Sequence, residues 1–415
     1  MGPGHLVDTA APATDSVVRR YRRVLDLLNL GTQLDPVALG SVSLREGVRA
    51  RRVHWSGVDI LVVDETSLME TGTYKDLDAC VTMSKIVEVG YESCTLSSGG
   101  NLNYAVARYA NRAGVSAFLF NPTTTLYKLD GQDFGSGSHL VAVDLPERQV
   151  KNLARTFSRH YGILHVPDLR WRLAASAMRA MFLIEEFARS GPVKWLAQTM
   201  CAGYGPAGIY SCFSELGREG LVPRSMVPKF LGFQQEANAP MVRAWRDEAR
   251  EISRSHLGAI PAKYIEPGLY NTNPEGNYTR LFDLMKFYGG DLMTIGAEDY
   301  TRYADPVIQM LAEAGITLDR IGQTDDVREK TPILTGVGIL KAIERGTLSR
   351  GDSVAFMVTG GSRQVNGHTQ PTPAIVVDDS QPLEEWVNDL GELFSLRANT
   401  AERRSDRLFS ERAVK

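Results

Sequence analysis

A lysine stands at the start of a predicted helix in the segment TYKDLDACVTMSKIVEVG, which covers residues 73–90. Small residues form a turn before Lys75, and the residues after it have the apolar spacing of an amphipathic helix. The positive potential at a helix N-terminus disfavours a cation, and a lysine amine is a nucleophile only when it is neutral. The position therefore suits a lysine that acts chemically, although a surface lysine paired with Asp76 or Asp78 fits the same motif.

A second turn, SSGGN, follows a predicted strand and consists of Ser97, Ser98, Gly99, Gly100 and Asn101. Small residues at such a turn leave several backbone N–H groups directed into the same space, where a carboxylate or a phosphate can bind. We expect an anion site here. The alternative role for Asn101 is that of a plain N-cap.

A third turn is rich in glycine and has the GxGxxG spacing; its residues are Ala202, Gly203, Tyr204, Gly205, Pro206, Ala207 and Gly208. This spacing alone is weak evidence for a dinucleotide. In a dinucleotide site an acidic residue after the next strand binds the ribose. Here that residue is Glu236, which lies farther along the chain from the glycines than such an acid usually does. A single phosphate held by backbone N–H groups is the simpler interpretation, and Pro206 fits a helix start because its missing N–H is not needed there. A nicotinamide-dependent dehydrogenase stays as an alternative.

A fourth segment, MVTGGSR, places Thr359 at the end of an apolar run. Its hydroxyl would face the same cleft, or it would serve only as a turn residue. All four segments fall at predicted strand ends, where α/β proteins bind their ligands. We therefore expect them to meet at one site.

The elements that must position these segments alternate between strands and helices, which predicts an α/β fold with mostly parallel sheets. Predicted strands cover residues 59–65, 94–96, 116–120, 139–143, 196–201, 230–234 and 353–358. Predicted helices cover residues 15–29, 101–112, 147–159, 171–188, 208–216, 241–253, 279–287, 297–314 and 333–345, with another that starts at residue 75.

The length of 415 residues exceeds one ordinary hydrophobic core, so two domains are expected. We predict disordered tails at both ends, a larger domain in two pieces and a smaller domain between them. The tails are residues 1–14 and 401–415, the larger domain is residues 15–65 and 191–400, and the smaller domain is residues 66–190.

Composition excludes several classes of protein. A net charge of −3, from Lys+Arg 46 and Asp+Glu 49, gives no basic footprint for nucleic acid or an anionic membrane. No apolar run approaches the roughly 20 residues that span a bilayer. The four cysteines have no CxxC spacing and the histidines have no metal-ligand spacing, so we expect a cytoplasmic protein without a metal site.

In their order along the chain, the lysine turn, SSGGN, the glycine turn and the Thr-Gly strand end resemble the fold-type II pyridoxal-phosphate enzymes, the tryptophan synthase β superfamily. Within that group the chain is most similar to the threonine synthase and cysteate synthase branch. TGTYKDLDACVTMSKI resembles the lysine segment of that branch, and FLGFQQEANAPMVRAW resembles its strand that runs on to Ala-Pro. The resemblance implies two three-layer α/β/α domains, with pyridoxal 5'-phosphate in the cleft between a large cofactor-binding domain and a smaller substrate-side domain.

The resemblance also implies roles for individual residues. Lys75 would form the Schiff base with the cofactor and act as the general base on the substrate. Asn101 would hydrogen-bond the ring hydroxyl, and Thr359 would meet the pyridine nitrogen. Residues 202–208 would hold the phosphate, and residues 97–100 would bind the substrate carboxylate. The chain departs from the branch at Leu102 and Asn103, which replace a Thr/Ser-Gly or Thr-Ala pair, and at Tyr204 and Pro206 in the phosphate loop.

Relatives in this branch act on phosphorylated amino acids, so an anion pocket beside the cofactor is expected. Lys128 is a candidate for it; Arg148, Lys151 and Arg155 on the next helix are further candidates, or form a solvated face. The leading hypothesis is a cysteate synthase-like replacement or elimination in which O-phosphoserine loses phosphate and sulfite or another nucleophile adds. The alternatives are a threonine synthase, a specialised biosynthetic relative and a binding protein without catalysis. The resemblance also implies a homodimer.

Overall fold

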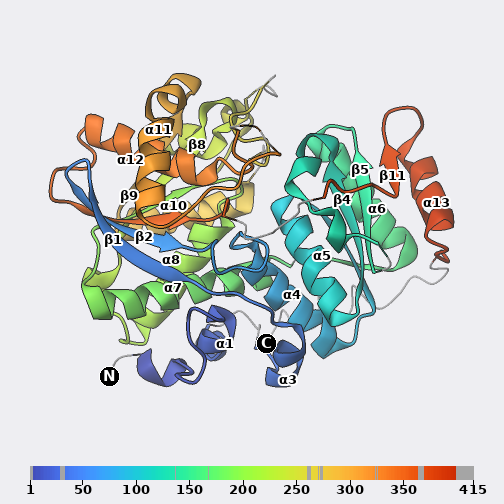
Figure 1. The fold of residues 1–415 in the computed structure, drawn as a ribbon, viewed down its shortest axis with the longest axis horizontal. Helices are drawn as coiled ribbons and strands as arrows, with labels where there is room; N and C mark the ends of the chain where they lie inside the picture. The colour runs from blue at the N-terminus through green and yellow to red at the C-terminus, as the bar shows by residue number, and fades with distance from the viewer. Residues whose placement is uncertain are drawn as a thin grey trace.

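The computed structural model of the chain describes residues 3–28, 33–135, 137–166, 168–258, 263–269, 271, 274–322, 324, 326–362 and 369–398 (Figure 1). Two β-sheets, one of six strands and one of five, carry helices on both faces. Nearly all strand pairs are parallel, because most strands are followed by a helical crossover. The predicted α/β fold with mostly parallel sheets is confirmed.

The six-stranded sheet has the order β1-β2-β10-β7-β8-β9. Its strands are β1 (Arg49–Trp55), β2 (Val58–Asp64), β7 (Trp195–Thr199), β8 (Lys229–Gln235), β9 (Gly290–Ile295) and β10 (Ser353–Val358). Only β1 and β2 pair antiparallel. One face packs on α7 (Leu169–Ser190), α8 (Tyr204–Arg218) and α10 (Glu275–Tyr288), and the other on α11 (Ala297–Glu313) and α12 (Thr331–Glu344).

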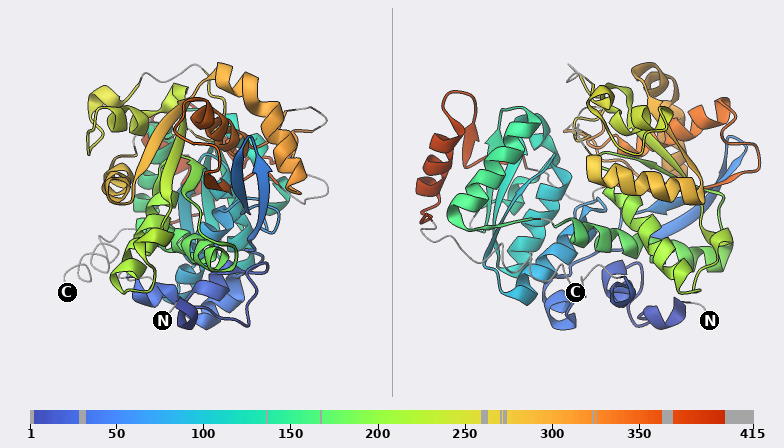
Figure 2. Two further views of the ribbon diagram at one scale, coloured as in Figure 1. Left: turned by 90° about the vertical axis from the view of Figure 1, so that its left-hand side faces the viewer. Right: turned by 180° about the vertical axis from the view of Figure 1, so that it is seen from behind.

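The five-stranded sheet has the order β11-β5-β4-β3-β6 and is parallel throughout. Its strands are β3 (Ser93–Ser97), β4 (Ser116–Pro122), β5 (Ser138–Val143), β6 (Leu164–His165) and β11 (Ile375–Val377). Helices α4 (Lys75–Val89) and α5 (Asn101–Ala113) cover one face, while α6 (Glu147–Tyr161) and α13 (Leu383–Leu393) lie side by side on the other (Figure 2).

Short elements connect these layers. The short α-helices are α1 (Val17–Tyr21), α2 (Val24–Leu27), α3 (Pro36–Val42) and α9 (Pro240–Arg246). The 3-10 helices are η1 (Pro3–Leu6), η2 (Thr123–Lys128), η3 (Gly131–Asp133), η4 (Arg224–Met226), η5 (Glu236–Asn238) and η6 (Arg254–His256). None of the helices in the described part of the chain is long and apolar enough to cross a membrane.

The structure differs from the predicted domain boundaries in three places. Leu6 and Val7 are buried, so the start of the chain packs on the core where a disordered tail was expected. The long helix α7, expected in the smaller domain, packs along α8 beneath the six-stranded sheet. Strand β11 and helix α13, expected in the larger domain, complete the five-stranded sheet instead, because β11 pairs with β5. The predicted tail at residues 401–415 lies outside the described residues.

Three predicted helices differ clearly from the expected ranges. The helix expected over residues 15–29 divides into α1 and α2. Helix α8 begins at Tyr204, before the expected Gly208, because Pro206 falls in its first turn, where a backbone N–H has no partner within the helix. Helix α9 ends at Arg246, well before the expected Ser253, and Glu248 then adopts a left-handed conformation with φ 53 that no helix can continue.

Candidate active site

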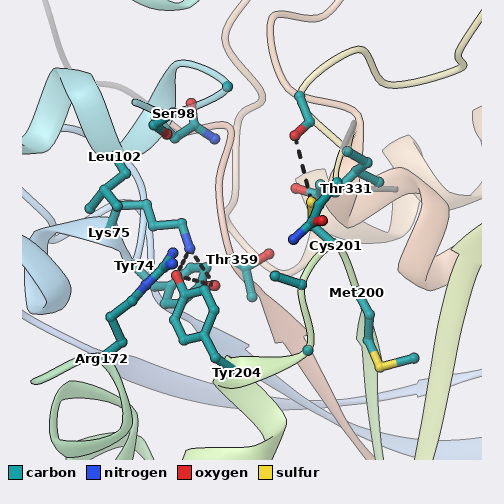
Figure 3. A pocket seen from close by; sticks show the side chains of 18 of the residues that line it. Tyr74, Lys75, Ser98, Leu102, Arg172, Met200, Cys201, Tyr204, Thr331 and Thr359 are labelled. Atoms are coloured by element: carbon teal, nitrogen blue, oxygen red, sulfur yellow. Dashed lines mark hydrogen bonds between the residues drawn. The ribbon is translucent and has the colours of Figure 1, made fainter. Parts of the chain in front are cut away.

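A cavity of about 450 Å³ lies between the two sheets. The ends of β3, β7 and β10 and the starts of α4 and α8 meet at it, as the parallel topology predicts (Figure 3). Most of the site residues predicted from the sequence line its wall: Lys75, Ser97, Ser98, Gly99, Asn101, Lys128, Ala202, Gly203, Tyr204, Gly205, Pro206 and Thr359. Gly100, Ala207 and Gly208 do not.

Lys75 is the first residue of α4, and its amine points into the cavity (Figure 3). Its Nζ donates hydrogen bonds to the hydroxyl of Tyr74, at 2.6 Å, and to the hydroxyl of Tyr204. The nearest carboxylate oxygen on its own helix is Asp78 Oδ2, at 3.6 Å, and the lysine side chain is only 16% exposed. The amine is therefore an enclosed group of the cavity and not a solvated surface lysine.

Two sets of hydrogen bonds hold the start of α4 in place. The buried carboxylate of Asp76 accepts from the backbone N–H of Thr71, at 2.8 Å, and from its hydroxyl, at 2.5 Å. The N–H of Tyr74 donates to the carbonyl of Thr359 at the end of β10, at 3.1 Å. The second contact places Thr359 and Lys75 at the same end of the six-stranded sheet.

The start of α8 is shaped by its glycines. Gly203 has a φ of +75, which L side chains rarely adopt, and within the described residues no side chain caps the helix. The N–H groups of the first turn have no partner inside the helix and can bind an anion in the cavity. A Cβ on Gly205 would lie 3.0 Å from Arg179 Nη1, and one on Gly208 would lie 2.5 Å from Ser176 Cβ on α7. Glycine thus keeps the cradle open and lets α8 pack closely on α7.

The turn after β3 contributes the opposite wall of the cavity. Its Gly100 has a φ of +116, and α5 also lacks a side-chain cap among the residues described. Asn101 is not the N-cap, because the helix begins at Asn101 and Gly100 holds the N-cap position. The amide Nδ2 of Asn101 donates to Glu329 Oε2 at 2.7 Å. Leu102 lines the cavity and makes this wall apolar. The turn combines an uncapped helix start with an apolar side chain.

Lys128 is buried between two carboxylates. Its Nζ lies 2.5 Å from Glu266 Oε1 and 2.6 Å from Glu329 Oε2, and its side chain is 1% exposed. Burial alone would lower the pKa of Lys128, but the two carboxylates raise it above its usual range. Burial raises the pKa of Glu266, whereas at Glu329 the ammonium of Lys128 outweighs burial and lowers the pKa. The charge of Lys128 is already compensated, which weakens its expected role in binding a substrate anion.

Other basic side chains line the cavity. Lys151, Arg155, His165 and Arg172 all contribute to its wall, although the sequence left a solvated face as the alternative for the first two. Arg172 was missed entirely: its guanidinium stacks on the ring of Tyr204, 3.6 Å from the centroid, and in the described structure its buried Nε has no hydrogen-bond partner. Nothing in the local sequence of α7 distinguishes this arginine from its solvated neighbours.

The cavity thus combines a lysine amine with an uncapped helix start that can bind an anion. A group that carries both an aldehyde and a phosphate, such as pyridoxal phosphate, fits this pair, and the Gly203 and Gly205 cradle provides room for the phosphate. The searched part of the structure holds no group of three or more His, Cys, Asp or Glu side chains that could bind a metal ion.

Comparison with protein families and curated proteins gives three findings. The sequence profile of a family described as "Pyridoxal-phosphate dependent enzyme" matches residues 47–318. Threonine synthase of Synechocystis sp. is 30% identical over 198 residues, which are 45% of this chain and 49% of that protein, so the match spans about half of that relative's length. Cysteate synthase of Methanospirillum hungatei is 22% identical over 323 residues, 76% of this chain and 73% of that protein.

Solved structures share the fold. A threonine deaminase from T.th. matches with a TM-score of 0.57 and 18% identity, over 75% of this chain and 89% of that chain. Diaminopropionate ammonia lyase from Escherichia coli matches with a TM-score of 0.59 and 12% identity, over 85% of this chain and 90% of that chain. At these identities the likeness concerns the arrangement of sheets and helices.

Proposed function

Because the chain belongs to the pyridoxal-phosphate dependent enzyme family, we propose that it catalyses a replacement or elimination reaction on a phosphorylated amino acid. The proposed substrate is O-phosphoserine, which would release phosphate and accept sulfite or another nucleophile, as in a cysteate synthase. The observation that carries the proposal is the meeting of Lys75, the uncapped start of α8 and the turn after β3 in one cavity.

Pyridoxal phosphate, when bound, withdraws electrons from the substrate and stabilises negative charge on Cα. We propose that Lys75 holds the cofactor through its amine and later moves the Cα proton at Nζ. The first-turn N–H groups of α8 would bind the cofactor phosphate. Thr359 and Asn101 would contact the ring, and the backbone of residues 97–100 would orient the substrate carboxylate. Lys75, Thr359, Asn101 and residues 97–99 line the cavity, which supports these assignments.

Charge in the cavity wall supports a phosphorylated substrate. Arg155 and Arg172 line the cavity; among the described residues neither side chain donates a hydrogen bond to a carboxylate, and Arg172 has only a long ion pair, with its Nε 3.9 Å from Asp78 Oδ2. A phosphate ester carries close to two negative charges near neutral pH, and guanidinium groups bind phosphate in a forked geometry. We therefore assign the leaving-group phosphate to these arginines and no longer to Lys128.

Two alternatives keep some support. A threonine synthase acting on O-phosphohomoserine is favoured by the 30% identity to the Synechocystis protein. A specialised relative with another nucleophile is favoured by Leu102, which makes the wall beside the substrate turn apolar. The dehydrogenase alternative loses its basis, since the family that matches residues 47–318 is that of pyridoxal-phosphate dependent enzymes.

The experiment begins with the colour of the purified protein. We expect a visible absorption band that borohydride abolishes, and a pyridoxyl group on Lys75 in the mass spectrum of the reduced protein. Lys75→Ala should lose both signals, whereas Lys85→Ala, on the same helix but outside the cavity and paired with Glu88 at 2.7 Å, should keep them. A reduced protein without pyridoxyl on Lys75 would overturn the assignment.

Phosphate release then identifies the substrate. O-phosphoserine and O-phosphohomoserine are compared in the presence of sulfite, water or a thiol. Release from O-phosphoserine that depends on sulfite supports the leading proposal, and release from O-phosphohomoserine in water supports the threonine synthase. Release from neither substrate would refute both.

We also propose that the enzyme is a cytoplasmic homodimer. The four cysteines are free, and three of them are buried, as suits a reducing compartment. The dimer rests on the family resemblance and is tested by light scattering of the purified protein.

A further inference from the structure

We infer that the hydroxyl of Tyr204 is a further catalytic group, which passes a proton between Lys75 and the buried carboxylate of Asp78. The inference rests on the proposed function, in which Lys75 must take up and release a proton during turnover. Glycine would suffice in a turn that binds phosphate through its backbone alone. The side chain at position 204 therefore needs its own explanation.

The three groups form a continuous hydrogen-bonded chain. Lys75 Nζ donates to the Tyr204 hydroxyl, which donates to Asp78 Oδ2 at 2.5 Å. The direct distance from Nζ to the same carboxylate oxygen is 3.6 Å, so the phenol bridges a gap too long for a hydrogen bond. Tyr74 donates to Tyr204 at 3.2 Å but does not contact Asp78, and it stands beside the path (Figure 3).

Asp78 has the properties of a proton acceptor. It lies one turn after Lys75 on α4, its side chain is 1% exposed, and in the described residues its Oδ1 has no hydrogen-bond partner. A buried carboxylate oxygen without a partner is costly, which argues against a purely structural role. Burial raises the pKa of this carboxyl group, and the charges of Lys75, Arg172 and Arg179 only partly oppose it. The group therefore accepts a proton more readily than an exposed aspartate.

The charges that face this chain come from α7 and from the residue that follows β2. Arg172 on α7 stacks on the ring of Tyr204 and has its Nε 3.9 Å from Asp78 Oδ2. Arg179, also on α7, lies over the ring of Tyr74 and is held by both oxygens of Glu65, at 2.6 Å each. The carboxylate of Asp78 at the end of the chain provides a place for a proton from Lys75.

The transfer balances as a double shift. One N–H bond of the Lys75 ammonium breaks as that proton forms an O–H bond on Tyr204, while the original Tyr204 O–H breaks and its proton forms an O–H bond on Asp78 Oδ2. The result is a neutral amine, an intact phenol and a neutral carboxylic acid. The reverse shift returns the proton to the amine. No bulk water is needed inside the cavity.

The test uses the holoenzyme and two variants that interrupt the chain, Tyr204→Phe and Asp78→Asn. The matched control is Tyr210→Phe, which removes a buried hydroxyl from the same helix, one that donates to the Pro228 carbonyl at 2.8 Å outside the cavity. The first readout needs no turnover: the visible absorption of each holoenzyme is titrated with pH. The second readout is the pH profile of kcat.

We expect both chain variants to lower the pH midpoint of the spectral change by about one unit, because the protonated form loses its hydrogen-bonded or negatively charged partner. We expect kcat to fall by about 100-fold, as when a general acid–base group is removed. Tyr210→Phe should change neither. Unchanged midpoints in both chain variants, or an equal shift in Tyr210→Phe, would overturn the inference.

Hydride reduction and mass spectrometry of the same samples separate this result from a failure of the proposed function. Pyridoxyl on Lys75 in every sample together with unshifted midpoints refutes only the proton chain. Absence of pyridoxyl from Lys75 in the unmodified protein refutes the proposed function itself. Should Asp78→Asn not fold, Tyr204→Phe decides alone, since it removes a single oxygen atom.

Discussion

Replacing Lys128 by methionine tests whether its ammonium serves to neutralise Glu266 and Glu329. The two glutamate side chains are 1% and 5% exposed, and both lie within 2.6 Å of Nζ. Methionine keeps most of the volume but leaves two buried carboxylates without a cation. Removing one partner of a buried ion pair costs about 3–5 kcal/mol, so we expect the free energy of unfolding to fall by that amount near neutral pH.

The size of this loss should depend on pH. In the unmodified protein the pKa of Glu329 is lowered by Lys128, so its stabilising effect is present above the ordinary glutamate value of about 4.3 and is lost as the pH falls through the folded value. Without the ammonium, only hydrogen bonds from neighbouring groups oppose burial, and the pKa of both glutamates rises. The two glutamates of the variant then take up protons at higher pH than in the unmodified protein. The loss of unfolding free energy in the variant should therefore become smaller as the pH is lowered from about 8 to about 5.

Urea unfolding followed by tryptophan fluorescence measures both effects. The control is Lys194→Met, which breaks a pair with Asp352 at 2.7 Å in which the lysine is 49% exposed. A surface pair of this kind contributes less than about 1 kcal/mol. If Lys128→Met loses as little unfolding free energy as the control, or if its loss does not change with pH, Lys128 does not serve to neutralise the two glutamates. The substrate-binding role of Lys128 expected from the sequence would then stand again.

Three further outcomes are expected. Gly208→Ala should destabilise the protein by about 1–3 kcal/mol in urea unfolding, because its Cβ would lie 2.8 Å from the Leu173 carbonyl. The control Gly217→Ala lies on the same helix, with its nearest atom at 3.6 Å, and should stabilise the protein by about 0.5–1 kcal/mol. Equal effects of the two substitutions would contradict the close packing of α8 on α7. Arg172→Met should weaken binding of pyridoxal phosphate or of the phosphorylated substrate by roughly tenfold or more in absorbance titrations, and unchanged affinities for both would exclude an anion-binding role. Glu65→Gln should lower the unfolding free energy by about 3–5 kcal/mol, because Arg179, which is 0% exposed, loses its carboxylate partner. A loss below about 1 kcal/mol would mean that the pair is not buried in solution.

The sequence predicts the strands and helices whose periodicity is local. β2 and β10 are continuous apolar runs buried on both faces, as expected of central parallel strands, and their limits agree closely with the prediction. β1 was missed because it is a hairpin edge with charged residues at exposed positions. The Ser56-Gly57 turn before β2, with φ values of 52 and 82, was the available signal for that hairpin.

Only part of the candidate site could be predicted from the sequence. The turns that carry Lys75 and the start of α8 were predicted because parallel topology gathers strand ends at one edge. The contacts of Lys128 could not be predicted, since Glu266 and Glu329 lie far along the chain in segments without a periodic pattern. Arg172 was missed for a related reason: it sits on a helix face, where sequence alone does not tell a solvated arginine from one turned toward a cavity.

Strand β11, which lies near the end of the chain, completes the five-stranded sheet, and this has a consequence for biosynthesis. Ile375 of β11 pairs with Val141 of β5, and α13 then covers the aromatic cluster around Phe118 and Phe157. During synthesis on the ribosome, the edge of β5 and this cluster stay exposed until the residues that form most of the six-stranded sheet have been translated. An exposed strand edge beside apolar side chains invites pairing with other nascent chains. We therefore expect the yield of native protein in cells to depend on chaperones that bind during this interval.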